Sequence, residues 1–201
     1  MQVEELTRAD RNDVIDILTE AFYDYPFMRF MLQGLDEEEY GRQLRLLNGF
    51  FADARIMRNW PFYGVRVDSD LVAAMLVSDP VFAPRPPELD RVYEQLCATV
   101  GEGAIKRMDD FDAATNGFMP DNATHFVGML GVRTAAQREG CGRVLLQHIE
   151  DVARERSESA GVTLTTETEA NVTYYESLGF RVLGSAEIGS VTSWLMFNEL
   201  E

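Results

Sequence analysis

Lysine is almost absent from this chain of 201 residues, because Lys106 is the only one and every other basic side chain is an arginine or a histidine. A P-loop for phosphate binding needs a Gly-Lys-Ser/Thr step, whereas Lys106 stands between Ile105 and Arg107. An enzyme that works through a Schiff base would have to use Lys106, which lies in a charged, helix-like stretch. The sequence therefore excludes both classes.

Cysteine and histidine are also scarce, with two of each. Cys97 and Cys141 are too few for a disulfide framework, which favours a reducing, cytoplasmic setting. Because these residues show no metal-ligand spacing, we expect no metal site. The residues after Met1 are polar and acidic and the longest apolar runs have the length of a strand, so the sequence predicts neither a secretory signal nor a membrane span.

Positive charge is in deficit, since 34 acidic residues face 18 basic ones and the net charge is −16 at pH 7. Nucleic-acid binding needs the opposite field, so we expect no nucleic-acid partner. Two interpretations of the negative charge stay open: solubility or a salt-rich habitat, and attraction of a cationic substrate or partner. Because 46% of the residues are apolar, we expect one domain over residues 1–201 with a substantial core.

The hydrophobic pattern predicts a mixed α/β order with a strand–helix–strand unit in the second half. We expect the first helix to be capped by Asp10 and ended or turned by Pro26. We expect strand 124–132 to be central and covered on both faces, with Val127 and Met129 sharing one face. The other expected strands are 1–6, 62–67, 71–77, 162–168, 180–188 and 191–197; the other expected helices are 36–57, 88–118 with a break near Gly101 and Gly103, 142–159 stopped by Gly161, and 170–178; residues 79–87 form a proline-rich connector.

The most informative segment follows the central strand and runs from Val132 to Arg143. Small residues and glycines at a strand-to-helix turn leave backbone N–H groups accessible, and the helix dipole adds positive potential, so this turn predicts an anion site. A tight turn that needs glycine only for its backbone angles is the alternative. The residues after Gly142 lack the third glycine of a dinucleotide-binding fingerprint, which excludes that motif.

Gln137, Gly140 and Gly142 match the Gln/Arg-x-x-Gly-x-Gly/Ala signature of the GCN5-related N-acetyltransferase (GNAT) family, which this sequence resembles. The segment from Asn171 to Phe180 resembles the family's Asn…Tyr…Leu-Gly-Phe block, and 164–168 resembles the strand before it. Residues 21–26 are similar to the turn near the start of many members. The likeness is specific over 124–180 and implies a mostly antiparallel sheet, flanked by helices, with splayed central strands.

The resemblance implies transfer of acetyl from acetyl-CoA, the co-substrate, to an amine. The backbone of Leu130, Gly131 and Val132 would then pair with the pantetheine arm. Asn171 would cap its helix or bond the cofactor. The backbone of Gln137, Arg138, Glu139, Gly140, Cys141, Gly142 and Arg143 would hold the pyrophosphate, with Arg133, Arg138 and Arg143 supplying positive charge.

The resemblance also implies that Tyr175 protonates the departing thiolate, although a packed aromatic beside Phe180 is the alternative. Glu167 is the expected general base, acting through a water, unless it is an exposed carboxylate. An amide near Gly131 or Val132 would stabilise the thioester oxygen, and Gly128 and Gly131 would permit a bulge there. At the position of Glu139 the family often has a basic residue. The Glu139 carboxylate would therefore have to point to solvent, away from the pyrophosphate.

The acceptor is the least defined feature of the sequence. An aromatic and acidic cluster (Phe22, Tyr23, Asp24, Tyr25 and Phe27, with Trp194) would suit a cationic amine, and core packing explains the same aromatics. The sequence predicts a small-molecule or peptide amine as partner and leaves its identity and a homodimer open. The alternatives are an acyl-CoA-binding sensor without catalysis and an unrelated α/β binding protein with a glycine-rich turn.

Overall fold

A computed structural model describes residues 1–81 and 84–200 of the chain. Its seven strands form one sheet in the order β1-β2-β3-β4-β5-β7-β6, in which only the β4–β5 pair is parallel. This confirms the expected mixed α/β fold with a mostly antiparallel sheet. The strands are β1 (Val3–Glu5), β2 (Phe62–Val67), β3 (Asp70–Ser78), β4 (His125–Val132), β5 (Gly161–Thr166), β6 (Arg181–Ile188) and β7 (Val191–Glu199).

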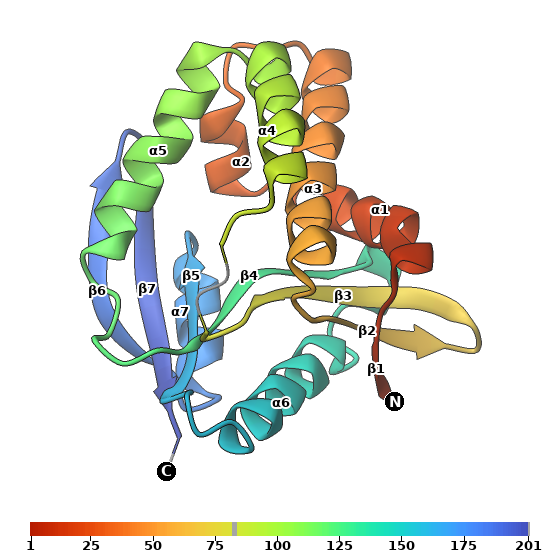
Figure 1. The fold of residues 1–201 in the computed structure, drawn as a ribbon, viewed down its shortest axis with the longest axis vertical. Helices are drawn as coiled ribbons and strands as arrows, with labels where there is room; N and C mark the ends of the chain where they lie inside the picture. Colours follow the sequence, from red (N-terminus) through yellow and green to blue (C-terminus); the bar gives the residue numbers. More distant parts are fainter. Residues whose placement is uncertain (82–83, 201) are drawn as a thin grey trace.

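Helices cover both faces of the sheet (Figure 1). On one face a core forms between the sheet and α1 (Arg11–Ala21), α2 (Pro26–Met31), α3 (Glu37–Arg58), α4 (Pro87–Val100) and α5 (Glu102–Asn116). On the other face a second core forms under α6 (Cys141–Arg154) and α7 (Glu169–Glu176). The expected connector 79–87 includes residues 82–83, which lie outside the described residues. Within the described part, no helix has the length and apolar character needed to span a membrane.

The two central strands separate soon after they meet. β4 and β5 pair only at their first residues, from His125 with Val162 to Val127 with Leu164. Beyond Val127, β4 continues to pair with β3 on its other edge. The second half of β4 therefore has a free edge that faces the gap between the two strands, as the resemblance implied.

A bulge in β4 changes which face its side chains take. Leu76 pairs with Met129 and the next β3 residue, Val77, pairs with Val127, so Gly128 is the extra residue. An extra residue shifts the two-residue alternation, and Val127 accordingly packs under α6 while Met129 packs under α1. The expectation that Val127 and Met129 share a face was wrong for this reason. The bulge lies at Gly128, whereas Gly131 pairs regularly with Ala74.

The start of the first helix also differs from its prediction. Asp10 makes no side-chain cap to α1; its carboxylate instead accepts hydrogen bonds from the N–H and hydroxyl of Thr7, in a capping box around a short 3-10 turn. Pro26 stands at the first position of α2, because a missing N–H costs nothing there. Pro26 thus begins a new helix after a break, and α1 has already ended at Ala21.

The long helix α6 ends earlier than its pattern suggests. The prediction placed its stop at Gly161, but the helix ends at Arg154 and an irregular segment with turns at residues 155, 157 and 158 leads to β5. Gly161 is the first residue of β5, with φ +151°. A Cβ there would lie 2.2 Å from the carbonyl oxygen of Asn198 on β7, so this glycine permits two strands to approach closely.

Candidate active site

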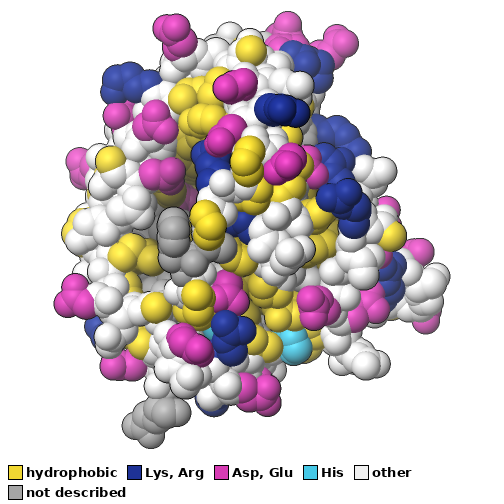
Figure 2. All heavy atoms as spheres, viewed as in Figure 1, with side chains coloured by type: hydrophobic (Ala, Val, Ile, Leu, Met, Phe, Trp, Pro, Cys, Tyr) yellow, Lys and Arg dark blue, Asp and Glu magenta, His cyan; other side chains and the backbone are white. Residues whose placement is uncertain are grey.

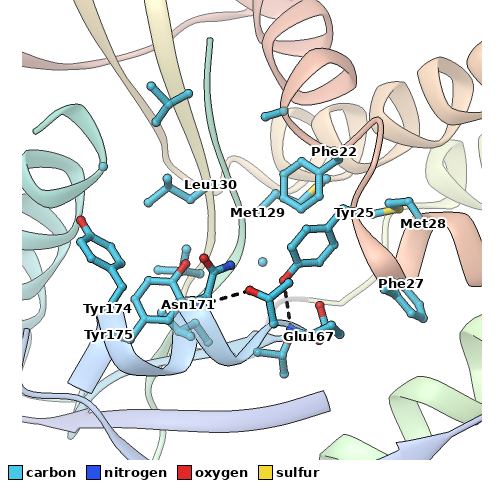
Figure 3. Close-up of a pocket in the computed structure, with 18 of the residues that line it drawn as sticks. Phe22, Tyr25, Phe27, Met28, Met129, Leu130, Glu167, Asn171, Tyr174 and Tyr175 are labelled. Carbon is cyan, nitrogen blue, oxygen red and sulfur yellow. Dashed lines mark hydrogen bonds between the residues drawn. The ribbon is translucent and has the colours of Figure 1, made fainter. Parts of the chain in front are cut away.

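A cavity of about 810 Å³ lies where β4 and β5 separate. The wall is formed by the α1–α2 turn with α2, by α3 and α5, by β4 with the loop after it and the start of α6, by the end of β5, and by α7. Figure 3 shows side chains from both sides of the sheet converging on it. Figure 2 shows hydrophobic side chains gathered near the middle of one face, with acidic ones around them. The residues that line it include Tyr25, Arg55, Gly128, Leu130, Val132, Gln137, Arg138, Gly140, Cys141, Gly142, Arg143, Glu167, Asn171 and Tyr175.

The loop between β4 and α6 presents unpaired backbone N–H groups to this cavity. Two consecutive turns require positive φ, +67° at Arg138 and +92° at Gly140, and α6 begins directly after them. In the described part of the chain, no acceptor takes a hydrogen bond from the backbone N–H groups of residues 138–143. Together with the N-terminus of a four-turn helix, these groups form a concave site for an anion.

The side chains of this loop divide between the cavity and solvent. Arg138 and Arg143 line the cavity, and within the described residues neither forms an ion pair. Glu139 is exposed and is absent from the cavity wall, so its acid points away from the anion site. Arg133 was expected to supply positive charge there, but it pairs with Glu20 at 3.2 Å. Glu20 also accepts the N–H of Thr134 at 2.7 Å and so ties α1 to this loop.

The free edge of β4 offers both donors and acceptors to the gap. The N–H of Arg133 bonds to the carbonyl of Val72 on β3. Because an antiparallel ladder alternates, Gly131 then also turns its N–H toward β3, and Leu130 and Val132 turn theirs toward the gap. The carbonyl of Val132 accepts from the Gln137 side chain at 3.3 Å, consistent with this direction. Of the two amides expected to meet the thioester oxygen, the geometry favours Val132 over Gly131.

Glu167 is buried rather than exposed, with 9% of its surface accessible. It follows the last residue of β5 and accepts a hydrogen bond from the Ser193 hydroxyl at 2.7 Å. Its backbone N–H donates to the hydroxyl of Tyr25, which also bonds Thr166 (Figure 3). Burial raises the pKa of Glu167 to about 7, against hydrogen bonds that lower it. A carboxyl in this state can accept a proton near neutral pH.

Asn171 and Tyr175 lie one helical turn apart on α7 and both face the cavity (Figure 3). Thr168, and not Asn171, caps this helix, because the Thr168 hydroxyl accepts the Asn171 N–H at 3.3 Å. The expectation that Asn171 caps its helix was therefore wrong, and the side-chain amide of Asn171 is available to a ligand. Burial raises the pKa of Tyr175, so its hydroxyl stays protonated at neutral pH. The centroid of its ring also lies 5.8 Å from that of Phe180, as predicted for an aromatic side chain packed beside Phe180.

The opposite end of the cavity differs from the expected acceptor pocket. Phe22, Tyr25 and Phe27 line the cavity, but Asp24 pairs with Arg29 at the surface and the Tyr23 hydroxyl donates to Glu37. Trp194, on β7, is absent from the wall as well. The charged groups at this end are instead Asp112 of α5 and Arg55 of α3. Burial and the nearby Asp109 raise the pKa of Asp112.

Arg55 was missed in the sequence, although a signal was present. It falls on the buried face of α3, in line with Leu44, Leu47 and Phe51, where a charged side chain is unusual. Ser193 was missed too, because a serine on a strand carries no mark of its partner. His125, the first residue of β4, is absent from the cavity wall and bonds the Ser159 hydroxyl at 2.9 Å. Within the described residues, no three His, Cys, Asp or Glu side chains gather as metal ligands would.

Comparison with known proteins agrees with this geometry. Residues 92–182 match the family described as "Acetyltransferase (GNAT) domain". No curated protein sequence is significantly similar to the chain. A structure described as a histone acetyltransferase HPA2 and related acetyltransferase, from Corynebacterium glutamicum, has a TM-score of 0.70 at 19% identity, covering 100% of this chain and 96% of the other.

Two further solved structures show the same fold. The PaiA N-acetyltransferase from Thermoplasma acidophilum, in complex with coenzyme A, has a TM-score of 0.58 at 15% identity and covers both chains fully. The ribosomal-protein-S18-alanine N-acetyltransferase from Escherichia coli has a TM-score of 0.58 at 16% identity, covering 100% of this chain and 95% of the other. The domain match and the shared fold confirm the resemblance seen in the motifs. Residues 92–182 thus match the GNAT domain family, and this match together with the shared fold supports an N-acetyltransferase that takes its acetyl group from acetyl-CoA.

Proposed function

We propose that the chain, as one domain over residues 1–201, transfers acetyl to the primary amine of a small molecule or peptide by direct attack in this cavity. The observation that carries the proposal is that Glu167 and Tyr175 line the same cavity as the loop whose N–H groups are unpaired. One end thus suits an anionic carrier, and the middle holds a proton acceptor and a proton donor. The acetyl group arrives as a thioester, whose carbonyl carbon is the electrophile.

The N–H groups of residues 138–143, with the Arg138 and Arg143 side chains, hold the pyrophosphate in this proposal. The adjoining backbone of Leu130 and Val132 pairs with the pantetheine arm along the free edge of β4. These local donors let a protein of charge −16 bind an anionic co-substrate. The Asn171 amide adds a side-chain hydrogen bond on the opposite wall.

In the transfer step, the amine nitrogen forms a bond to the acetyl carbon and the bond from that carbon to sulfur breaks. Glu167 accepts the proton that the nitrogen loses, directly or through a water, and later releases it to solvent. Tyr175 gives its proton to the departing thiolate and regains one from water. The Val132 N–H stabilises the thioester oxygen as negative charge develops on it.

The test is a panel of amines mixed with acetyl-CoA and assayed by CoA release. The panel contains polyamines, amino acids, aminoglycosides and peptides with free N-termini, and the product is identified by mass. Turnover with one class supports the proposal. Tight CoA binding without turnover on the whole panel would instead support a binding module. A cytoplasmic location stays a prediction and a homodimer stays open, since this assay addresses neither.

A further inference from the structure

The end of the cavity beneath α3 and α5 contains a buried cation without an anionic partner. Arg55 is 8% exposed, and no described carboxylate lies within salt-bridge distance of its guanidinium. Its one hydrogen bond is a long one, 3.4 Å from Nη2 to the Ser78 hydroxyl. Its Nε is buried and has no partner among residues 1–81 and 84–200. Most of the donors on this guanidinium are therefore unsatisfied by the described residues.

The bulge in β4 admits this guanidinium. A Cβ on Gly128 would lie 2.4 Å from the Arg55 Nη2, so any other residue at that position would displace the side chain. Both residues line the cavity, and the bulge is where β4 leaves its partner β5. Arg55 therefore approaches the reaction space at the point where the strands separate.

The described surroundings of Arg55 include no carboxylate within salt-bridge distance. The one charged group that shifts the pKa of Arg55 is Arg58, one turn further along α3, which has the same sign. Burial and Arg58 lower the pKa of Arg55 to about 10, so it remains a cation at neutral pH. Asp112 lines the same end, but its pKa responds to burial and to Asp109, and not to Arg55. A buried cation in this state favours an anionic ligand strongly.

We propose that Arg55 binds the carboxylate of the acceptor, so that the substrate is an amine that also carries a carboxylate on an apolar body, such as a hydrophobic amino acid. The inference rests on the proposed function and names its substrate class. The amine would lie toward Glu167 and the carboxylate toward α3.

Two observations favour a carboxylate over a phosphate at Arg55. A single guanidinium matches the charge of one carboxylate and its planar fork binds both oxygens, whereas a phosphate dianion would leave a negative charge uncompensated. Apart from Asp112, the other described side chains at this end are apolar, among them Phe51, Met108, Phe111 and Phe126, and provide no second cation. The same side chains would pack against the apolar body of the acceptor.

The experiment compares leucine with isoamylamine, which lacks only the carboxylate, in the wild type and in Arg55→Met. In the wild type kcat/KM should favour leucine. In the variant, kcat/KM for leucine should fall about 10- to 100-fold relative to isoamylamine, the loss expected for a hydrogen bond to a charged group. Because the comparison is a ratio between two proteins, the different basicities of the two amines cancel.

Arg58→Met is the matched control. Arg58 is also partly buried, but it stacks over Trp60 and is absent from the cavity wall. Its loss should leave the ratio between leucine and isoamylamine unchanged. Arg55→Lys keeps the charge, and it should recover part of the preference if Arg55→Met folds poorly. Both Arg55 variants should bind CoA as the wild type does.

Binding separates this inference from the proposed function. Calorimetry should show that N-acetylleucine binds the wild type at least tenfold more tightly than N-isoamylacetamide, and that Arg55→Met removes the difference. That result without turnover on any amine would support the carboxylate site and refute the proposed activity. Turnover with no preference for leucine, or with the same ratio in Arg55→Met, would refute the carboxylate site and leave the activity standing.

Discussion

Replacing Glu167 with glutamine should make the protein more stable above pH 7 while it removes most of the activity. Glutamine keeps the oxygen that accepts the Ser193 hydroxyl and removes the titrating proton. The buried carboxyl has a pKa of about 7 in the folded protein, against 4.5 for an unperturbed group. Between these two pH values the folded protein binds more protons than the unfolded chain.

The sign of the effect follows from proton linkage. Where the folded state binds more protons, the free energy of unfolding falls as pH rises, so the Glu167 contribution falls between about pH 4.5 and pH 7 and is constant above. A pKa raised from 4.5 to about 7 corresponds to a loss of about 3 kcal/mol across that window. Glu167→Gln should not suffer this loss.

Urea denaturation at several pH values, in steps from 4.5 to 8.5, measures the difference between the variant and the wild type. The difference should grow with pH in favour of the variant and level off above pH 7. Glu169→Gln is the control, since Glu169 is an exposed carboxylate two residues further along the chain. A difference that does not change with pH would show that Glu167 is ionised at its ordinary value, and the argument for a proton acceptor would fail.

The same variant tests the chemistry. If Glu167 accepts the proton of the amine, the pH profile of kcat/KM for the wild type should have an acidic limb, along which kcat/KM rises with pH up to about 7. In Glu167→Gln that limb should disappear and the rate should fall by about 10²- to 10⁴-fold, with CoA binding unchanged. Wild-type turnover in the variant would assign the proton to another acceptor.

Three further substitutions test the other parts of the site and the fold. Tyr175→Phe should lower kcat by about 10²-fold with little change in the KM for acetyl-CoA, measured by CoA release; an unchanged kcat would remove Tyr175 as the acid. Gly140→Asp should abolish CoA binding in calorimetry, whereas Gly34→Asp, at a similar φ of +86° and equally open space, should share its backbone strain and bind CoA normally. Gly161→Ala should lower the free energy of unfolding by about 3 kcal/mol in urea, because its Cβ would lie 2.2 Å from a β7 carbonyl oxygen, and Gly117→Ala, at φ −63°, should be nearly neutral.

Local patterns predicted the elements of this fold well. Helix α3 begins after Asp36 and ends at Arg58, one residue from each predicted bound, because its cap and its apolar stripe are both local signals. The β2–β3 hairpin follows for the same reason. The errors occur where a distant contact decides the outcome, as at Gly161, whose backbone approaches β7.

The position of the site was predictable for the backbone groups and for the motif residues. The loop after Gln137 supplies free N–H groups, and its glycines, among them Gly140 with its positive φ, were the local signal that predicted them. The positive φ at Arg138 had no such signal, because arginine rarely adopts it. The bulge was expected, but its position at Gly128 depends on the register of β4 against β3. Register is a property of two strands, and one strand alone does not reveal it.

The charges inside the cavity were not predictable, because burial decides their state and burial arises from three separate segments. In the sequence, Glu167 is an ordinary carboxylate after a strand. In the fold it is enclosed by Tyr25 and Ser193, which come from the first and last parts of the chain. Arg55 is likewise one arginine among several on a long helix. It reaches the cavity because Gly128 has no side chain to occupy the space of its guanidinium. The reactive carboxyl and the unpaired cation thus have one origin, a sheet that opens at its centre and encloses polar groups that the elements alone would leave in solvent. The two groups share this space, so an acceptor whose carboxylate pairs with Arg55 would exclude water from Glu167 and strengthen its action as a base.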